Sequence, residues 1–333
     1  ETLSIPLLAT VPNATSGRTQ PAAGWPVVIF QHGITGNRTN MLGLADAFAG
    51  QGFVVVAIDQ PLHGITDTTN PLYQAANERT FNLDVMNNST GAAGPDGVID
   101  SSGASFINLT SLLTARDNLR QASADLITLT RSVGNLDVTG DGVADIDPTR
   151  IHFVGQSLGS IVAVSWLSVS PAVNTATLSV PGGLVTQLLL DSPSFAPRIN
   201  AGLQAQGLLP GTTLYAQFFR DAQNVIDAGD PVNYIADAAA SKPILLHQVL
   251  GDIVVPNSAT QRLIDLGGLA KVGTPGMNPV SRAYVNFTAG VHASLLDPTA
   301  SLAATVEMQS QAVAFAASGG TMVVVTNPAV VQP

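Results

Sequence analysis

Ser157 stands in a context that could make its hydroxyl a nucleophile. It is the centre of the run Gly155-Gln156-Ser157-Leu158-Gly159, which follows an apolar stretch at 151–154 and opens another at 158–169. A strand, a G-x-S-x-G turn and a helix in this order form a nucleophile elbow, whose strained turn lifts the serine above a sheet. Glycines suit both flanks because the turn leaves little room for side chains. The alternative interpretation is a glycine-flanked serine that only caps a helix.

A serine hydroxyl reacts as a nucleophile only when a base takes its proton, so a histidine should approach Ser157 in space. His292 is our candidate for that base, because it follows a short apolar run and precedes the last long helical pattern. The alternative interpretation is an ordinary loop histidine. The other four histidines lie earlier in the chain: His32, His63, His152 and His247.

The histidine needs a carboxylate that fixes its tautomer and stabilises the imidazolium. Asp252 is the first choice, because it follows a predicted buried strand and falls between the serine and the histidine in the chain. Asp191, at the end of another apolar run, is the alternative, and Asp297 is the third candidate. Asp252 could also be a turn aspartate that caps its own loop.

Acyl transfer also requires two backbone amides that stabilise the oxyanion of the tetrahedral intermediate. We expect one to be the amide of Leu158 and the other that of Ile34, in the run Gln31-His32-Gly33-Ile34-Thr35-Gly36. Gly33 would permit the backbone shape that this turn needs. The alternative is a generic glycine turn in which His32 is hydrogen-bonded locally.

Asp59 and His63 form a second acid and histidine pair, in Asp59-Gln60-Pro61-Leu62-His63-Gly64. We interpret them as structural residues that hold the loop beside the oxyanion turn.

An acidic turn at 137–147 resembles part of a calcium-binding loop. Asp137, Thr139, Asp141 and Asp145 occupy ligand positions, but Pro148 stands where such a loop needs a bidentate acid. The sequence therefore leaves two interpretations open, a structural Ca²⁺ site and a simple acidic turn. No cofactor is required for the chemistry considered above.

Apolar runs that alternate with helical patterns predict one α/β domain over residues 1–333, with a mostly parallel, doubly wound sheet. The clearest predicted strands are at 27–30, 53–58, 151–154, 185–190, 244–249 and 285–287. Extra edge strands are expected at 3–11 and 322–326, and helices at 41–49, 109–133, 158–169 and 300–317. Two intervals exceed the length of simple connections, 64–106 and 192–241. The second carries many Leu and Phe residues between two predicted core strands, which suits an inserted helical lid.

Composition narrows the class of partner. The net charge is -10, and Lys242 and Lys271 are the only lysines, so nucleic acid is an unfavourable partner. Cysteine is absent, which excludes disulfides and thiol catalysis. The sequence has no apolar run long enough for a transmembrane span. A cysteine-free, lysine-poor, acidic chain is typical of a secreted or cell-surface bacterial protein whose signal segment lies outside this sequence.

With the elbow, the His-Gly turn and the ordered acid and histidine, the chain resembles the α/β-hydrolase superfamily over nearly its whole length. The run Asp117-Asn118-Leu119-Arg120-Gln121, the acidic turn and the elbow together resemble bacterial extracellular and surface-exposed lipases and lysophospholipases. This resemblance implies a carboxylesterase or lipase that acts on small-molecule or lipid esters through an acyl-enzyme, a lid that contacts a lipid interface, and export. Many relatives carry a second glycine after the motif, where this chain has Ser160.

The same constellation of residues could serve a polyester hydrolase, an amidase or an acyltransferase, because these differ in pocket shape and water access. A hydrolase scaffold that has become a binding or adhesion module is a more remote alternative. Such modules often lose the triad, whereas the triad predicted here is complete.

Overall fold

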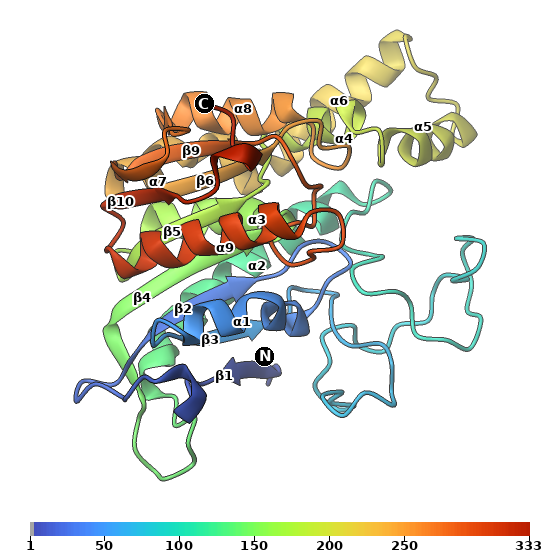
Figure 1. Cartoon of the computed structure of the whole chain (residues 1–333). Helices are drawn as coiled ribbons and strands as arrows, with labels where there is room; N and C mark the ends of the chain where they lie inside the picture. Colours follow the sequence, from blue (N-terminus) through green and yellow to red (C-terminus); the bar gives the residue numbers. More distant parts are fainter. Residues whose placement is uncertain (1–2) are drawn as a thin grey trace.

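The chain folds around an eight-stranded, mostly parallel sheet in a computed structural model that describes residues 3–333 (Figure 1). The strand order is β1-β3-β2-β4-β5-β6-β9-β7, and β1 is the one antiparallel member of this described sheet. Its strands are β1 (Leu7–Thr10), β2 (Trp25–Gln31), β3 (Val54–Ile58), β4 (Ile146–Gln156), β5 (Val173–Ser179), β6 (Ile244–Val249), β7 (Ala270–Lys271) and β9 (Arg282–Phe287). A separate antiparallel pair joins β8 (Gly276–Pro279) to β10 (Met322–Val325).

Helices cover both faces of the sheet (Figure 1). They are α1 (Leu42–Ala49), α2 (Leu112–Ser132), α3 (Leu158–Val169), α4 (Val185–Asp191), α5 (Ala196–Ala205), α6 (Thr213–Ile226), α7 (Ile235–Ser241), α8 (Asn257–Gly267) and α9 (Leu302–Ala317). Because successive strand residues point to opposite faces, Val27 and Ile29 belong to a core with α2, α3, α7 and α8. Val28 and Phe30 belong to the opposite core, with α1 and α9. The sheet is thus buried on both faces, as the continuous apolar runs of its strands predict.

The prediction of an α/β-hydrolase fold with a mostly parallel sheet is confirmed, but one predicted strand is wrong. Residues 185–190 form helix α4, and the strand beside β4 is β5, which the sequence analysis missed. Leu184 precedes α4 in a left-handed conformation, with φ 58°. The buried carboxylate of Asp230 accepts hydrogen bonds from the Leu184 and Val185 amides at 3.0 and 2.7 Å. A distant aspartate therefore caps this helix, which local sequence could not reveal.

The expected edge strands exist in altered form. The first is β1, within the predicted range 3–11, and it pairs antiparallel with β3. The second, at 322–326, is β10, which pairs with β8 outside the main sheet.

The two long intervals differ in structure, although the first interval and helices α5 and α6 of the second lie on the same side of the molecule (Figure 1). Residues 64–106 are almost entirely irregular, with a single bridge between Met86 and Ala93. Residues 192–241 contain α5, α6 and α7.

No helix within residues 3–333 combines the length and the apolar character needed to cross a bilayer.

Candidate active site

The turn at Ser157 has the strained geometry of a nucleophile elbow. Ser157 joins β4 to α3 with φ 54° and ψ -119°, a conformation that non-glycine residues rarely adopt. Two backbone hydrogen bonds hold it there: the Ser157 amide donates to the Ser179 carbonyl at 2.9 Å, and the Ile161 amide donates to the Ser157 carbonyl at 3.0 Å. The strain is thus supported by the neighbouring strand and the first turn of the helix.

The two glycines of the motif are required by close packing. A Cβ at Gly155 would lie 2.8 Å from the backbone of Ser160. A Cβ at Gly159 would lie 2.1 Å from the carbonyl oxygen of Gln31, in the adjacent strand β2. Neither contact could be relieved by turning a flexible side chain, so the tight turn depends on both glycines.

The structure brings Ser157, His292 and Asp252 into one chain of hydrogen bonds. His292 Nε2 lies 2.7 Å from Ser157 Oγ, and His292 Nδ1 lies 2.6 Å from Asp252 Oδ2. The other carboxylate oxygen of Asp252 accepts from the amides of Val254 and Val255 at 2.8 and 3.1 Å. With Nδ1 protonated and donating to the carboxylate, Nε2 is left as the acceptor for the serine hydroxyl.

These three residues come from loops at the carboxyl ends of three strands. Ser157 follows β4, Asp252 follows β6, and His292 follows β9. The Asp252 side chain is almost fully buried, whereas that of His292 is 16% exposed, so the carboxylate is shielded from water and the imidazole is partly open to it.

Gln156, the residue before the serine, also holds the histidine loop. Its Nε2 donates to the backbone carbonyl of His292 at 2.6 Å. The sequence analysis did not single out Gln156, because its role depends on a contact with a residue 136 positions away.

The turn after β2 lies directly against the serine. A Cβ at Gly33 would lie 3.1 Å from Ser157 Cβ and 3.6 Å from Ser157 Oγ, so a side chain at this position would crowd the serine. Thr35 has φ 65°, and the Gly36 amide donates to the Gly33 carbonyl at 3.1 Å, which closes a tight turn around Ile34. Within residues 3–333, the Ile34 amide donates to no other group of the protein. Leu158 is the first residue of α3, where amides lack partners within the helix.

A buried network of charges lies next to the turn at 31–36. Arg38, only 2% exposed, forms ion pairs with Asp59 and with Glu78, and its amide donates to Asp59 Oδ1 at 2.6 Å. Because Asp59 ends β3 and Glu78 lies in the long irregular segment, the network joins that segment to the sheet. Burial raises the pKa of Asp59 to about 6, against the opposing effect of Arg38.

Asp59 belongs to this network, whereas His63 has contacts of its own, and neither residue is hydrogen-bonded to Ser157. His63 Nδ1 lies 2.9 Å from the Pro61 carbonyl, and its ring packs 5.0 Å from that of His32. His32 Nε2 accepts from the Gln60 amide at 3.1 Å, so its Nδ1 carries the proton and donates to the Gly33 carbonyl at 2.8 Å. His32 therefore holds the turn at 31–36 through hydrogen bonds, and His63 packs against His32.

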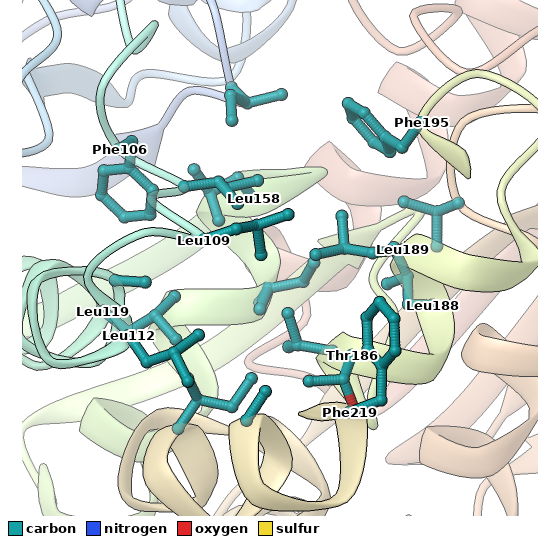
Figure 2. A pocket seen from close by; sticks show the side chains of 18 of the residues that line it. Phe106, Leu109, Leu112, Leu119, Leu158, Thr186, Leu188, Leu189, Phe195 and Phe219 are labelled. Atoms are coloured by element: carbon teal, nitrogen blue, oxygen red, sulfur yellow. The ribbon is translucent and has the colours of Figure 1, made fainter. Parts of the chain in front are cut away.

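An apolar pocket opens at Ser157. Apart from the serine, the only polar side chain on its wall is that of Thr186 (Figure 2). The wall is built by the end of the first long interval, the start of α2, α4 and the α5–α6 segment, through residues that include Phe106, Leu112, Leu188, Phe195 and Phe219. A group that enters this pocket exchanges water for aliphatic and aromatic carbon, and it meets few partners for hydrogen bonds.

With this geometry established, comparison with known proteins identifies the superfamily. The family described as having the alpha/beta hydrolase fold matches residues 26–231. The chain belongs to the α/β-hydrolase family. No curated protein sequence matches this α/β-hydrolase.

Solved structures share the fold at low sequence identity. An acetyl xylan esterase from Paenibacillus sp. R4 is 17% identical, with a TM-score of 0.52, over 86% of this chain and 75% of that one. A monoacylglycerol lipase from Paleococcus ferrophilus is 15% identical, with a TM-score of 0.50, over 95% and 100% of the two chains. An acylaminoacyl peptidase from Pyrococcus horikoshii is 14% identical, with a TM-score of 0.50, over 93% and 38%. Because all are below 25% identity, they show the fold and leave the substrate open.

The alternative acids lie elsewhere in this α/β-hydrolase. Asp191 is exposed at the end of α4, where it accepts from Gln187 Nε2 at 2.7 Å. Asp297 accepts from the amide and hydroxyl of Thr299 at 2.9 and 2.5 Å, as a turn aspartate does. The remaining histidines, His152 and His247, are buried in strands β4 and β6.

The acidic turn does not fit calcium coordination. Both carboxylate oxygens of Asp137 accept hydrogen bonds from backbone amides of the turn, including those of Gly140 and Gly142 at 2.6 and 2.7 Å. Asp145 Oδ2 likewise accepts from the amides of Val138 and Thr139 at 2.8 and 2.9 Å. Among residues 3–333, no cluster of three or more acidic, histidine or cysteine side chains could hold a metal ion. The oxygens that a cation would need accept the hydrogen bonds that close the turn.

Proposed function

We propose that this α/β-hydrolase is a serine carboxylic ester hydrolase that acts on esters with an apolar acyl group. The observation that carries the proposal is the hydrogen-bonded chain Ser157–His292–Asp252 at the mouth of an almost wholly apolar pocket. The family match supports hydrolase activity, and the esterase and lipase among the structures of the same fold agree with it.

In the first half-reaction, Ser157 Oγ attacks the ester carbonyl carbon while its proton passes to His292 Nε2. The amides of Ile34 and Leu158 stabilise the oxyanion that forms, and the N-terminal end of α3 adds a favourable dipole. The tetrahedral intermediate collapses to an acyl-enzyme, and the departing alkoxide takes the proton from His292.

In the second half-reaction, His292 removes a proton from water, and the resulting hydroxide attacks the acyl-enzyme. Collapse of the second intermediate breaks the bond to Ser157 Oγ, which recovers its proton from His292, and the carboxylic acid leaves. Asp252 stays ionised throughout and stabilises the imidazolium that forms in both steps.

The pocket favours an apolar acyl group over a peptide. A bound peptide presents amide groups that must keep hydrogen bonds, and an unsatisfied buried amide costs about 1–3 kcal/mol. The pocket wall offers almost no partners for such groups, whereas each buried methylene of an acyl chain gains about 0.8 kcal/mol.

The segment 192–241 is proposed to serve as a lid over this pocket. Phe195, the residue before α5, and Phe219 and Ile226, from α6, contribute to the pocket wall. Exposed Leu209 and Leu214 lie on the same segment, which would suit contact with a lipid interface.

The direct test of the proposal is labelling with a fluorophosphonate probe, together with hydrolysis of p-nitrophenyl butanoate and octanoate. Ser157→Ala should abolish labelling and lower kcat by about 10⁵- to 10⁶-fold, because the nucleophile is lost. Ser168→Ala is the matched control, since Ser168 lies at the far end of the same helix, and it should leave both readouts unchanged. Hydrolysis by correctly folded Ser157→Ala protein at the rate of the unaltered enzyme would end the assignment.

A further inference from the structure

The pocket at Ser157 is separated from a second hollow by a thin wall. The second hollow lies between α4 and α6 and is lined by Tyr215, Gln187 and Arg220, among others. Thr186 and Phe219 line both spaces, so these two side chains form the wall between them. In the view of Figure 2, Phe219 and Thr186 lie across the pocket from Leu158, the neighbour of the serine. An acyl chain that extends away from Ser157 would therefore end at this wall.

Thr186 is the fixed half of the wall. Its Oγ1 donates to Gln223 Oε1 at 2.6 Å, and Gln223 Nε2 donates to Asp227 and Asp230 at 2.7 and 2.9 Å. Asp230 is fully buried and also caps α4. Movement of Thr186 would break a chain of hydrogen bonds that ties α4 to α6.

Phe219 is the half of the wall that only packing holds. Its ring is 7% exposed and lies 4.9 Å from Tyr215 and 5.2 Å from Phe218, centroid to centroid. No hydrogen bond constrains a phenyl ring, so its size alone decides how far the apolar space extends.

We propose that Phe219 sets the upper limit on acyl-chain length, by closing the end of the acyl pocket against the second hollow. This inference rests on the proposed ester hydrolase function. Removal of the ring would join the two spaces into one longer site, whereas a larger ring at this position would shorten the pocket.

The test compares kcat/KM for p-nitrophenyl butanoate, octanoate, dodecanoate and hexadecanoate. Two further buried methylenes, at about fourfold each (the equivalent of about 0.8 kcal/mol), should raise the ratio of hexadecanoate to octanoate about 15-fold in Phe219→Ala. Phe219→Trp should lower the same ratio. Val225→Ala is the matched control, because Val225 is half-buried on α6 but lines neither space, and its ratio should be unchanged.

Phe219→Leu serves if the alanine variant does not fold, since leucine keeps an apolar side chain but removes the ring. A chain-length profile in folded Phe219→Ala and Phe219→Leu that matches that of Val225→Ala would overturn the inference while leaving the ester hydrolase assignment intact.

A binding measurement separates the two proposals. Straight-chain fatty acids from octanoate to hexadecanoate are allowed to displace a fluorescent anthroyloxy fatty acid from Ser157→Ala protein, with and without Phe219→Ala. A shift of the tightest competitor to longer chains supports the wall at Phe219 even if no ester is hydrolysed, and an unchanged order of competitors contradicts it.

Discussion

Replacement of Asp252 by asparagine should disable the base without disturbing the fold. Asp252 Oδ1 accepts from the amides of Val254 and Val255 at 2.8 and 3.1 Å, so the carbonyl oxygen of an asparagine would keep that position. Its NH₂ group would then face His292 Nδ1, at the place where Oδ2 now lies 2.6 Å away. Because the NH₂ can only donate, Nδ1 would become the acceptor and Nε2 would carry the proton. His292 could then no longer accept the proton of Ser157.

The size of the effect follows from the cost of the opposite amide orientation. Turning the amide around would restore the active tautomer but sacrifice two hydrogen bonds to backbone amides, at about 0.5–1.5 kcal/mol each, and leave those amides facing a donor. The active arrangement is therefore a minor state, and the accompanying loss of the carboxylate charge weakens stabilisation of the imidazolium. We expect kcat to fall by about 10⁴-fold, the loss found when the triad acid of a serine protease is changed in the same way.

The assay is hydrolysis of p-nitrophenyl octanoate at pH 7.5, with KM and thermal stability measured alongside. Asp191→Asn is the matched control, because Asp191 is the alternative acid of the sequence analysis and is exposed on α4, and its kcat should stay within about twofold of the unaltered enzyme. If Asp191→Asn lost activity while Asp252→Asn kept it, the assignment of the acid would be refuted.

Two further predictions concern stability. Burial lowers the pKa of four histidines, to about 3 for His32 and His247 and to about 4 for His63 and His152. In the unfolded chain these histidines bind protons near pH 6.5, whereas in the folded chain they stay neutral. The free energy of unfolding should therefore have its full value above pH 6.5. Between pH 6.5 and about 4, the free energy of unfolding should fall by about 1.4 kcal/mol per pH unit for each histidine. Urea unfolding at pH 7.5 and 5.5 would measure this loss, and equal free energies of unfolding at the two pH values would contradict the prediction. Gly159→Ala should lower the free energy of unfolding by about 3 kcal/mol, because its Cβ would clash with the Gln31 carbonyl. The control is Gly202→Ala, on helix α5 with open space around it, which should raise the free energy of unfolding by about 0.5–1 kcal/mol in the same urea assay.

Short-range patterns in the sequence were sufficient to predict the elbow. A Cβ at Gly155 or Gly159 would lie 2.8 or 2.1 Å from neighbouring backbone atoms, so both positions around Ser157 require glycine. Five adjacent residues therefore determine the geometry of the turn. The positions of Asp252 and His292 followed from the order of strands, because parallel strands present their carboxyl ends at one edge.

The error at 185–190 has a different physical origin. The run Val-Thr-Gln-Leu-Leu-Leu is apolar enough for a buried strand or a buried helix, and periodicity cannot separate the two over so few residues. The true strand, β5, was missed because it contains polar residues such as Thr175, which is buried and lies 2.8 Å from His152 Nδ1. Contacts with residues distant in the chain decided both cases, as they did for Gln156 and Arg38.

Secretion or cell-surface display is a prediction that rests on composition and resemblance alone. Fractionation of cells that express the full-length gene would test it.

The proposed catalytic residues and the pocket wall should respond differently to substitution, because they belong to different parts of the fold. Ser157, Asp252 and His292 follow strands that are buried on both faces, so moving any of them would require repacking of the main core. The wall at Phe219 belongs to α6, which also carries exposed Leu214 and packs mainly against α2 and α4. A change of ring size at that wall is absorbed locally, whereas a single Cβ at Gly159 meets the backbone of β2. Acyl-chain preference should therefore change readily by substitution on α6, while the geometry of the elbow tolerates almost none.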